Sequence, residues 1–166
     1  DTLIVEAQRE IQIPVYSTIA AKLPIALRHT PTSIGIVPKS LFVNQAGFVL
    51  SDALHNISGV NVQSNFGVHD FFLIRGFGSL SNGLVMTDGA SEPEAMYYHL
   101  YNIDRVEVLK GPGAFLYGGN PLSGTVNLQR KQPVFTNFVN AQGTYGKFNT
   151  LRGSVDAGVG DIEKGI

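Results

Sequence analysis

The sequence has 166 residues, with 12 Lys and Arg against 13 Asp and Glu, and it contains no cysteine. Nucleic-acid binding depends on clustered positive charge, so this balanced chain without long basic runs is not predicted to bind nucleic acid. The lack of cysteine excludes disulfides, thiol nucleophiles and Cys-ligated zinc from the sequence. Charged residues are only 15% of the chain and 19 residues are glycine, which is typical of a turn-rich β protein.

The N-terminal stretch, residues 1–29, has one short apolar patch at residues 3–5 and no helical period after it. We expect this stretch to be an extended segment followed by a linker. No apolar run in the sequence approaches the roughly 18 residues of a membrane helix, so a helical membrane protein is not predicted.

Residues 30–133 alternate short strand patterns with one clear helical pattern, which predicts an α+β domain. The predicted strands are "TSIGIV", "GVNVQS", "FFLIRGF", "GLVMT", "RVEVLKG" and "GTVNLQR". The strand "GLVMT" is followed by Asp88 and Gly89, a pair that favours a tight hairpin turn.

The helical pattern lies in "LSDALHNISG", residues 50–59, where apolar residues recur at helical spacing. We predict that Ser51 caps the start of this helix and that Gly59 ends it. The residues expected on its buried face are Leu50, Ala53, Leu54 and Ile57.

The glycine-rich stretch "GPGAFLYGGNP" does not match a nucleotide-binding loop. It lacks the Gly-Lys-Ser/Thr end of a phosphate-binding loop and the third glycine of a dinucleotide fingerprint. The four histidines are scattered, and no set of titratable residues converges in the sequence. We therefore expect no enzyme active site, no metal site and no cofactor.

Residues 134–166 contain two stretches with a period of two, "FVNAQGTYG" and "TLRGSVDAGVG", joined by "GKFN". Each stretch is about ten residues long with one apolar and one polar face, which suits a membrane-barrel strand as well as a strand of a soluble sandwich. Two strands cannot close a barrel, so a barrel interpretation requires further strands beyond Ile166.

In order and spacing, "FFLIRGF", "VMTDG" and "RVEVLKGPGAFLYGGNPLSGTVNLQRKQP" resemble the plug domain of TonB-dependent outer-membrane receptors of the ferric-siderophore branch. The usual small-Gly-Gly of this motif is replaced here by Leu122, Ser123 and Gly124. The resemblance implies residues 1–29 as TonB box and linker, 30–133 as a plug with a small mixed sheet and short helices, and 134–166 as the first antiparallel hairpin of a transmembrane β-barrel.

The resemblance also implies roles for single residues. Arg75 and Lys110 are expected to face acidic residues of the barrel wall; an internal pair between Arg75 and Glu107 is the alternative. The glycines of the motif are expected to let the plug backbone lie close to the barrel wall. The ligand-contact candidates are Phe66, Tyr97, Tyr98 and His99, and for each the alternative is packing within the plug or against the barrel.

The opening "DTLIVEA" is similar to the family's TonB box, which is expected to bind TonB by adding a strand to its sheet. This segment comprises Asp1, Thr2, Leu3, Ile4, Val5, Glu6 and Ala7. The implied partners are TonB, a ferric siderophore and the lipid of the outer membrane of a Gram-negative bacterium. Haem, cobalamin or a carbohydrate as cargo, and a soluble α+β ligand-binding module with an exposed hairpin, remain as alternatives.

Overall fold

The computed structural model describes residues 16, 17, 19, 26–65, 69–78, 83–92, 97–117 and 123–160. The segment expected to bind TonB, residues 1–7, and the ligand candidate Phe66 lie outside the described residues. Contacts divide the chain into two units, Asp1–Arg130 and Lys131–Ile166, and each is described by itself.

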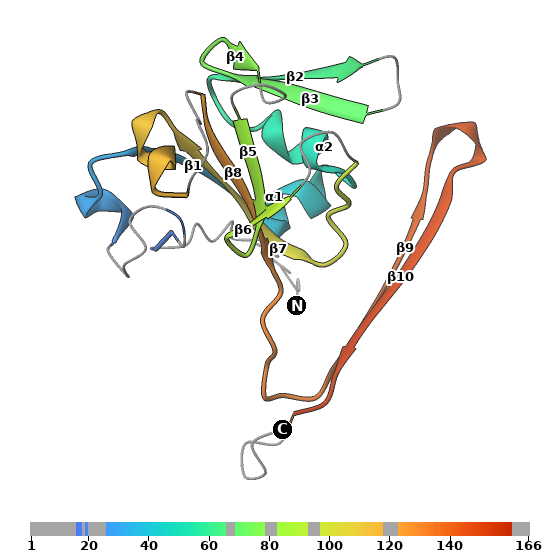
Figure 1. The fold of residues 1–166 in the computed structure, drawn as a ribbon. Helices are drawn as coiled ribbons and strands as arrows, with labels where there is room; N and C mark the ends of the chain where they lie inside the picture. Colours follow the sequence, from blue (N-terminus) through green and yellow to red (C-terminus); the bar gives the residue numbers. More distant parts are fainter. Residues whose placement is uncertain are drawn as a thin grey trace, which may run out of the picture. The chain divides into compact units, whose positions relative to one another are not determined.

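The first unit is built on a five-stranded sheet, which Figure 1 shows in the middle of that unit. Its strands, in spatial order, are β1 (Ser33–Pro38), β7 (Ile103–Lys110), β8 (Gly124–Arg130), β5 (Gly83–Thr87) and β6 (Ala90–Glu92). The pairing between β8 and β5 is parallel and all other pairings are antiparallel. The predicted small mixed sheet is therefore confirmed.

Two short helices and a second sheet complete the apolar core of this unit (Figure 1). The helices are α1 (Lys39–Asn44) and α2 (Leu50–Leu54). The second sheet is antiparallel, with strands β2 (Val60–Asn65), β3 (His69–Ile74) and β4 (Phe77–Gly78). Two 3-10 turns, η1 (Leu27–His29) and η2 (Pro112–Tyr117), lie before β1 and between β7 and β8.

The main core lies on one face of the five-stranded sheet because side chains alternate between the two faces of a strand. Val106 and Val108 of β7 point to this face, and the helices and the second sheet pack against it. The other members of the core that the sheet supplies are Val37, Val85, Ile103, Val126 and Leu128. Fully burying one such side chain stabilises a fold by roughly 1.5–3 kcal/mol, so this face holds the unit together.

Helix α2 confirms the predicted buried face, since Leu50, Ala53, Leu54 and Ile57 are all buried. The predicted caps were wrong. Position Val49 is the N-cap, and the Asp52 carboxylate reaches back to accept hydrogen bonds from the backbone N–H groups of residues 48 and 49, at 2.7 and 3.1 Å. The helix already ends at Leu54, so Gly59, with φ of 77°, lies in the turn before β2 and not at the C-cap.

Gly124 stands at the last position of the motif's usual small-Gly-Gly. A glycine is required there inside the plug sheet. Its φ is 147°, and a Cβ there would stand against the carbonyl oxygen of Leu109 in the neighbouring strand. The close approach that this glycine permits within the plug is therefore between β7 and β8; the expected approach of the motif's glycines to the barrel wall stays a prediction. The glycines at 118 and 119 lie outside the described residues.

The second unit is an antiparallel hairpin of β9 (Phe138–Tyr145) and β10 (Leu151–Gly158), joined by η3 (Lys147–Asn149). The register sets Val155 opposite Ala141 and Leu151 opposite Tyr145, and it sets Ser154 opposite Gln142. One face is therefore apolar and the other polar, as predicted from the period of two. The apolar side chains are solvent-exposed in this unit, with Val155 75% exposed.

None of the helices within the described ranges has the length and apolar character needed to cross a membrane.

Candidate functional site

The second face of the five-stranded sheet carries a layer of buried polar side chains. Glu107 of β7 is 0% exposed, although Val106 and Val108 on either side of it belong to the apolar core of the first face. The neighbouring strand β8 adds Thr125, Asn127 and Gln129 to the same polar layer. A carboxylate is almost never fully buried without partners, so Glu107 marks the centre of a polar site.

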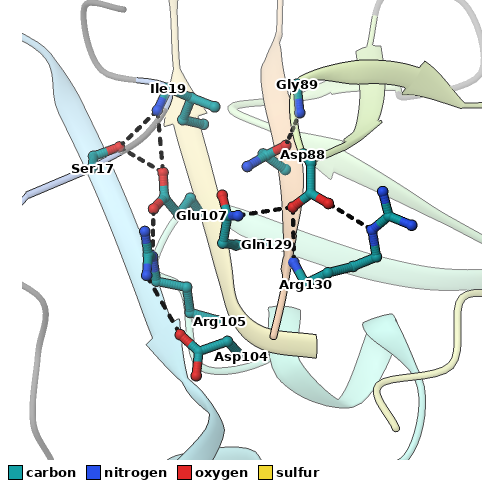
Figure 2. Close-up of polar contacts among 10 residues, drawn as sticks. Ser17, Ile19, Asp88, Gly89, Asp104, Arg105, Glu107, Gln129 and Arg130 are labelled. Carbon is teal, nitrogen blue, oxygen red and sulfur yellow. Dashed lines mark hydrogen bonds and ion pairs between the residues drawn. The ribbon is translucent and has the colours of Figure 1, made fainter. Parts of the chain in front are cut away.

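Glu107 joins the N-terminal part of the chain to the sheet, as Figure 2 shows. Its Oε2 accepts a hydrogen bond from the Ser17 hydroxyl at 2.6 Å and a longer one from the Ile19 backbone N–H at 3.3 Å. The other oxygen, Oε1, accepts from Arg105 Nε at 2.7 Å. Donors from two separate parts of the chain therefore compensate one buried negative charge.

Tyr117, at the end of η2, completes the attachment of the N-terminal part. Its hydroxyl donates to the carbonyl oxygen of Ile19 at 2.8 Å. Burial raises the pKa of Tyr117, and the negative charge of Glu107 raises it further. The phenol therefore stays protonated and remains a hydrogen-bond donor.

Asp88, in the turn between β5 and β6, binds the end of β8 (Figure 2). Its Oδ1 accepts from Gln129 Nε2 at 2.8 Å and from the Arg130 backbone N–H at 2.9 Å, while its Oδ2 accepts from Arg130 Nε at 2.5 Å. Burial alone would raise the pKa of Asp88, but the hydrogen bonds and positive charge of Arg130 outweigh it, and the pKa lies below the ordinary value.

Arg75, in the turn after β3, lies near Lys110, the last residue of β7. Lys110 Nζ donates to the carbonyl oxygen of Ser58 at 2.5 Å. Burial lowers the pKa of Lys110, and the positive charge of Arg75 lowers it further. The structure thus brings together two cationic side chains that the sequence motif had singled out.

The alternative pair between Arg75 and Glu107 is wrong. Glu107 takes Arg105 as its basic partner, at 2.7 Å. The physical reason is the position of the two side chains: Glu107 points to the polar face in the middle of β7, whereas the Arg75 guanidinium lies beside Gly111, after the end of that strand.

The aromatic segment at residues 97–99 is attached to the start of α2. The Tyr98 carbonyl oxygen accepts from the Leu50 N–H at 2.8 Å, and His99 forms a β-bridge with Val49. The ring of Tyr98 is partly buried against the apolar core, which fits the packing alternative. Tyr97, 42% exposed, and His99 present their side chains to the exterior of this unit.

Within the described residues, no group of three or more His, Asp or Glu side chains is placed to hold a metal ion.

The arrangement of a mixed sheet, short helices and a glycine-dependent β7–β8 connection defines a plug domain. Residues 26–125 match the family model of the TonB-dependent receptor plug domain, which covers more than half of the chain. The chain therefore belongs to this family and carries the plug domain of a TonB-dependent receptor.

Relatives of similar sequence are named as receptors and are much longer than this chain. The chain is 29% identical to the probable TonB-dependent receptor BfrD of Bordetella pertussis, over 84% of this chain and 19% of the relative. It is 27% identical to the catecholate siderophore receptor Fiu of Escherichia coli, over 94% and 21%. The chain spans about a fifth of the length of the curated relatives it matches.

Solved structures of receptors contain the same fold. The open form of the ferric-catecholate import receptor Fiu from E. coli K12 matches with a TM-score of 0.73 and 26% identity, over 86% of this chain and 21% of that one. The ferripyoverdine receptor of Pseudomonas aeruginosa matches in fold with a TM-score of 0.78, over 90% of this chain and 20% of the receptor chain.

Proposed function

We propose that this chain is the N-terminal part of an outer-membrane active transporter that imports ferric siderophores in a Gram-negative bacterium. The observation that carries the proposal is the plug-family match together with relatives named as siderophore receptors, such as Fiu and the siderophore receptor PiuA of Acinetobacter baumannii. The plug has no enzymatic role in this proposal. Family membership favours a receptor over a soluble binding module.

Energy coupling is assigned to Asp1 through Ala7. An extended segment can add as a strand to the sheet of TonB, with backbone hydrogen bonds supplying affinity and Leu3 and Val5 supplying side-chain contacts. Support for this role comes from the position of the segment: the chain that follows it reaches Ser17, which is hydrogen-bonded to the plug sheet at Glu107.

Arg75 and Lys110 are assigned to hold the plug in its barrel. Two neighbouring cations repel each other, and the lowered pKa of Lys110 reflects its burial and that repulsion. A carboxylate placed between them would relieve both effects. Acidic side chains of the barrel wall are the partners that the proposal supplies.

Ligand contact is assigned to Tyr97 and His99, with Phe66 as a further candidate. Exposed aromatic rings can pack against a flat chelate over a large area. Tyr98 is assigned a supporting role, because its ring packs on the core and its carbonyl oxygen holds α2. The hairpin β9–β10 is assigned to the barrel, with its exposed apolar face toward lipid.

The experiment is uptake of radioactive iron by cells whose only siderophore receptor is the full-length protein that contains this chain. We expect accumulation from a ferric siderophore, tested with catecholate and hydroxamate complexes, and loss of accumulation when the gene is deleted. Growth on haem, cobalamin or a carbohydrate as the sole required nutrient, without uptake of any ferric siderophore, would contradict the proposed cargo and leave the family membership intact.

A further inference from the structure

The two faces of the five-stranded sheet differ in the side chains that they bury. The face toward α1 and α2 is apolar, with Val106, Val108 and Leu128 fully buried. The opposite face is mixed: its polar side chains lie on the two central strands β7 and β8, and its apolar cluster of buried residues in the described part of the chain is small, formed by Ile19, Met86 and Leu109 with Ile34 and Tyr117 packed against it. Uncovering the polar face therefore exposes little apolar area to water, whereas uncovering the first face would dismantle the core.

The polar face also contains one buried hydroxyl group, Thr125 Oγ1, without a hydrogen-bond partner among the described residues. A buried hydroxyl without a partner destabilises the closed arrangement, because it has lost its hydrogen bond to water.

Ser17 and Ile19 attach the N-terminal part of the chain to the sheet mainly through one acceptor atom, Oε2 of Glu107. Both residues are almost fully buried, at 4% and 1% exposed, and both donate to Oε2 of Glu107. The Ile19 N–H also donates to Ser17 Oγ at 3.2 Å, so the two donors form one cooperative group around one oxygen. Tyr117 adds a single neutral hydrogen bond to the Ile19 carbonyl.

The attachment is reversible because Glu107 has a second partner, Arg105, that does not leave with Ser17 and Ile19. Arg105 lies two residues away on the same strand and binds the other carboxylate oxygen, Oε1. When Ser17 and Ile19 leave, Glu107 keeps its ion pair with Arg105, and water replaces the lost donors on Oε2. The departure therefore does not strand an unpaired buried charge, which is the large penalty in breaking a buried ion pair.

We propose that Glu107, Ser17 and the Ile19 N–H form a releasable latch, which holds the N-terminal part of the chain on the polar face of the sheet and opens without unfolding the apolar core. Among the described residues, Ser17 is the first attachment to the sheet met by a load applied at the N-terminus. The latch follows from these contacts and does not depend on TonB binding to Asp1–Ala7, so failure of one assignment leaves the other testable.

The test is hydrogen exchange of the full-length receptor, read at the peptide that carries the Ile19 amide and at peptides of the β7 and β8 ladder. Ser17→Ala removes one donor and leaves the Glu107–Arg105 pair in place, and Glu107→Gln removes the charge. Because a hydrogen bond to a charged group is stronger than a neutral one, we expect exchange at Ile19 to accelerate about tenfold or more in each variant, with the β7–β8 ladder unchanged.

The matched control is Asp104→Asn. Asp104 also contacts Arg105, at 3.4 Å, but it does not take part in the hydrogen bonds of Ser17 and Ile19, so exchange at Ile19 should stay at the wild-type rate. Unchanged exchange at Ile19 in Ser17→Ala would overturn the latch. Equal acceleration at Ile19 and in the β7–β8 ladder would also overturn it, because opening would then be unfolding of the whole plug. If Glu107→Gln fails to assemble, Ser17→Ala decides alone.

Discussion

Asp88 and Arg130 join the β5–β6 turn to the last residue of β8 through two contacts, from the Arg130 N–H at 2.9 Å and from its Nε at 2.5 Å. A second contact holds the same turn, since its Gly89 N–H donates to Asn127 Oδ1 at 2.9 Å. Arg130 is also the last residue of the first unit. The Asp88–Arg130 pair therefore fixes the place where the chain leaves the plug.

Asp88→Asn should destabilise the plug of the full-length receptor by about 0.5–1 kcal/mol, because the pair is partly exposed and solvent screens it. The folded pKa of Asp88 is depressed below the ordinary value of 3.8, so its contribution is present above that value and is lost as pH falls through the lowered pKa. Denaturant unfolding at neutral and at acid pH measures the difference. Asp104→Asn is the control, and an effect of Asp88→Asn that grew toward acid pH would contradict the pairing.

Gly124→Ala should prevent correct plug folding, at a cost of roughly 3 kcal/mol or more, because a φ of 147° is strained for alanine and its Cβ would meet the Leu109 carbonyl oxygen. Gly78→Ala is the matched control, since a Cβ there meets nothing within 4 Å. Protease resistance of the plug in the assembled receptor is the measurement. Equal resistance in the two variants would show that the β7–β8 contact is not needed.

Arg75→Ala or Lys110→Ala should loosen the plug in its barrel, since each removes a cation from the proposed contact with acidic side chains of the barrel wall. The expected result is faster protease cleavage of the plug and a higher leak of small antibiotics in cells. Arg130→Ala removes a plug cation that already has Asp88 as its partner, and it serves as the control. If leak and cleavage stay at wild-type level in both variants, the barrel-facing assignment fails.

Sequence patterns predicted the features that depend on residues close together in the chain. The period of α2 gave its buried face, and Asp88-Gly89 gave a turn in which both residues have positive φ, 50° and 83°. The cap of α2 was missed because Asp52, three residues inside the helix, supplies the carboxylate that Val49 lacks.

Contacts between distant residues were beyond such reasoning. Ser17 and Glu107 are 90 positions apart, and no spacing rule connects them. The available signal was a single glutamate at an inward position of an apolar strand, which implies a buried partner without naming it. Arg75 was only the alternative partner of Glu107; the period of two of a strand places Arg105, two residues away, on the same face of the sheet as Glu107.

The hairpin β9–β10 should lie in the bilayer with Val155 and Leu151 toward lipid. Val155→Arg should then impair barrel assembly, since an arginine near the bilayer midplane costs roughly 2–4 kcal/mol, whereas Ser154→Arg on the polar face is the tolerated control. The accessibility of spin labels at positions 151, 154, 155 and 156 in bilayers distinguishes a membrane-spanning hairpin from a soluble one. Oxygen should reach the odd positions preferentially; equal access of a water-soluble quencher to Val155 and Ser154 would exclude a lipid-facing strand.

The most direct test of the coupled-transport account is a comparison of binding and uptake in Leu3→Pro and Val5→Pro forms of the full-length receptor. Proline removes a backbone N–H and fixes φ, so it disrupts strand addition to TonB without altering the plug core. Ferric-siderophore binding to whole cells should remain at the wild-type level while energy-dependent uptake of radioactive iron is lost. Normal uptake in both variants would contradict the account.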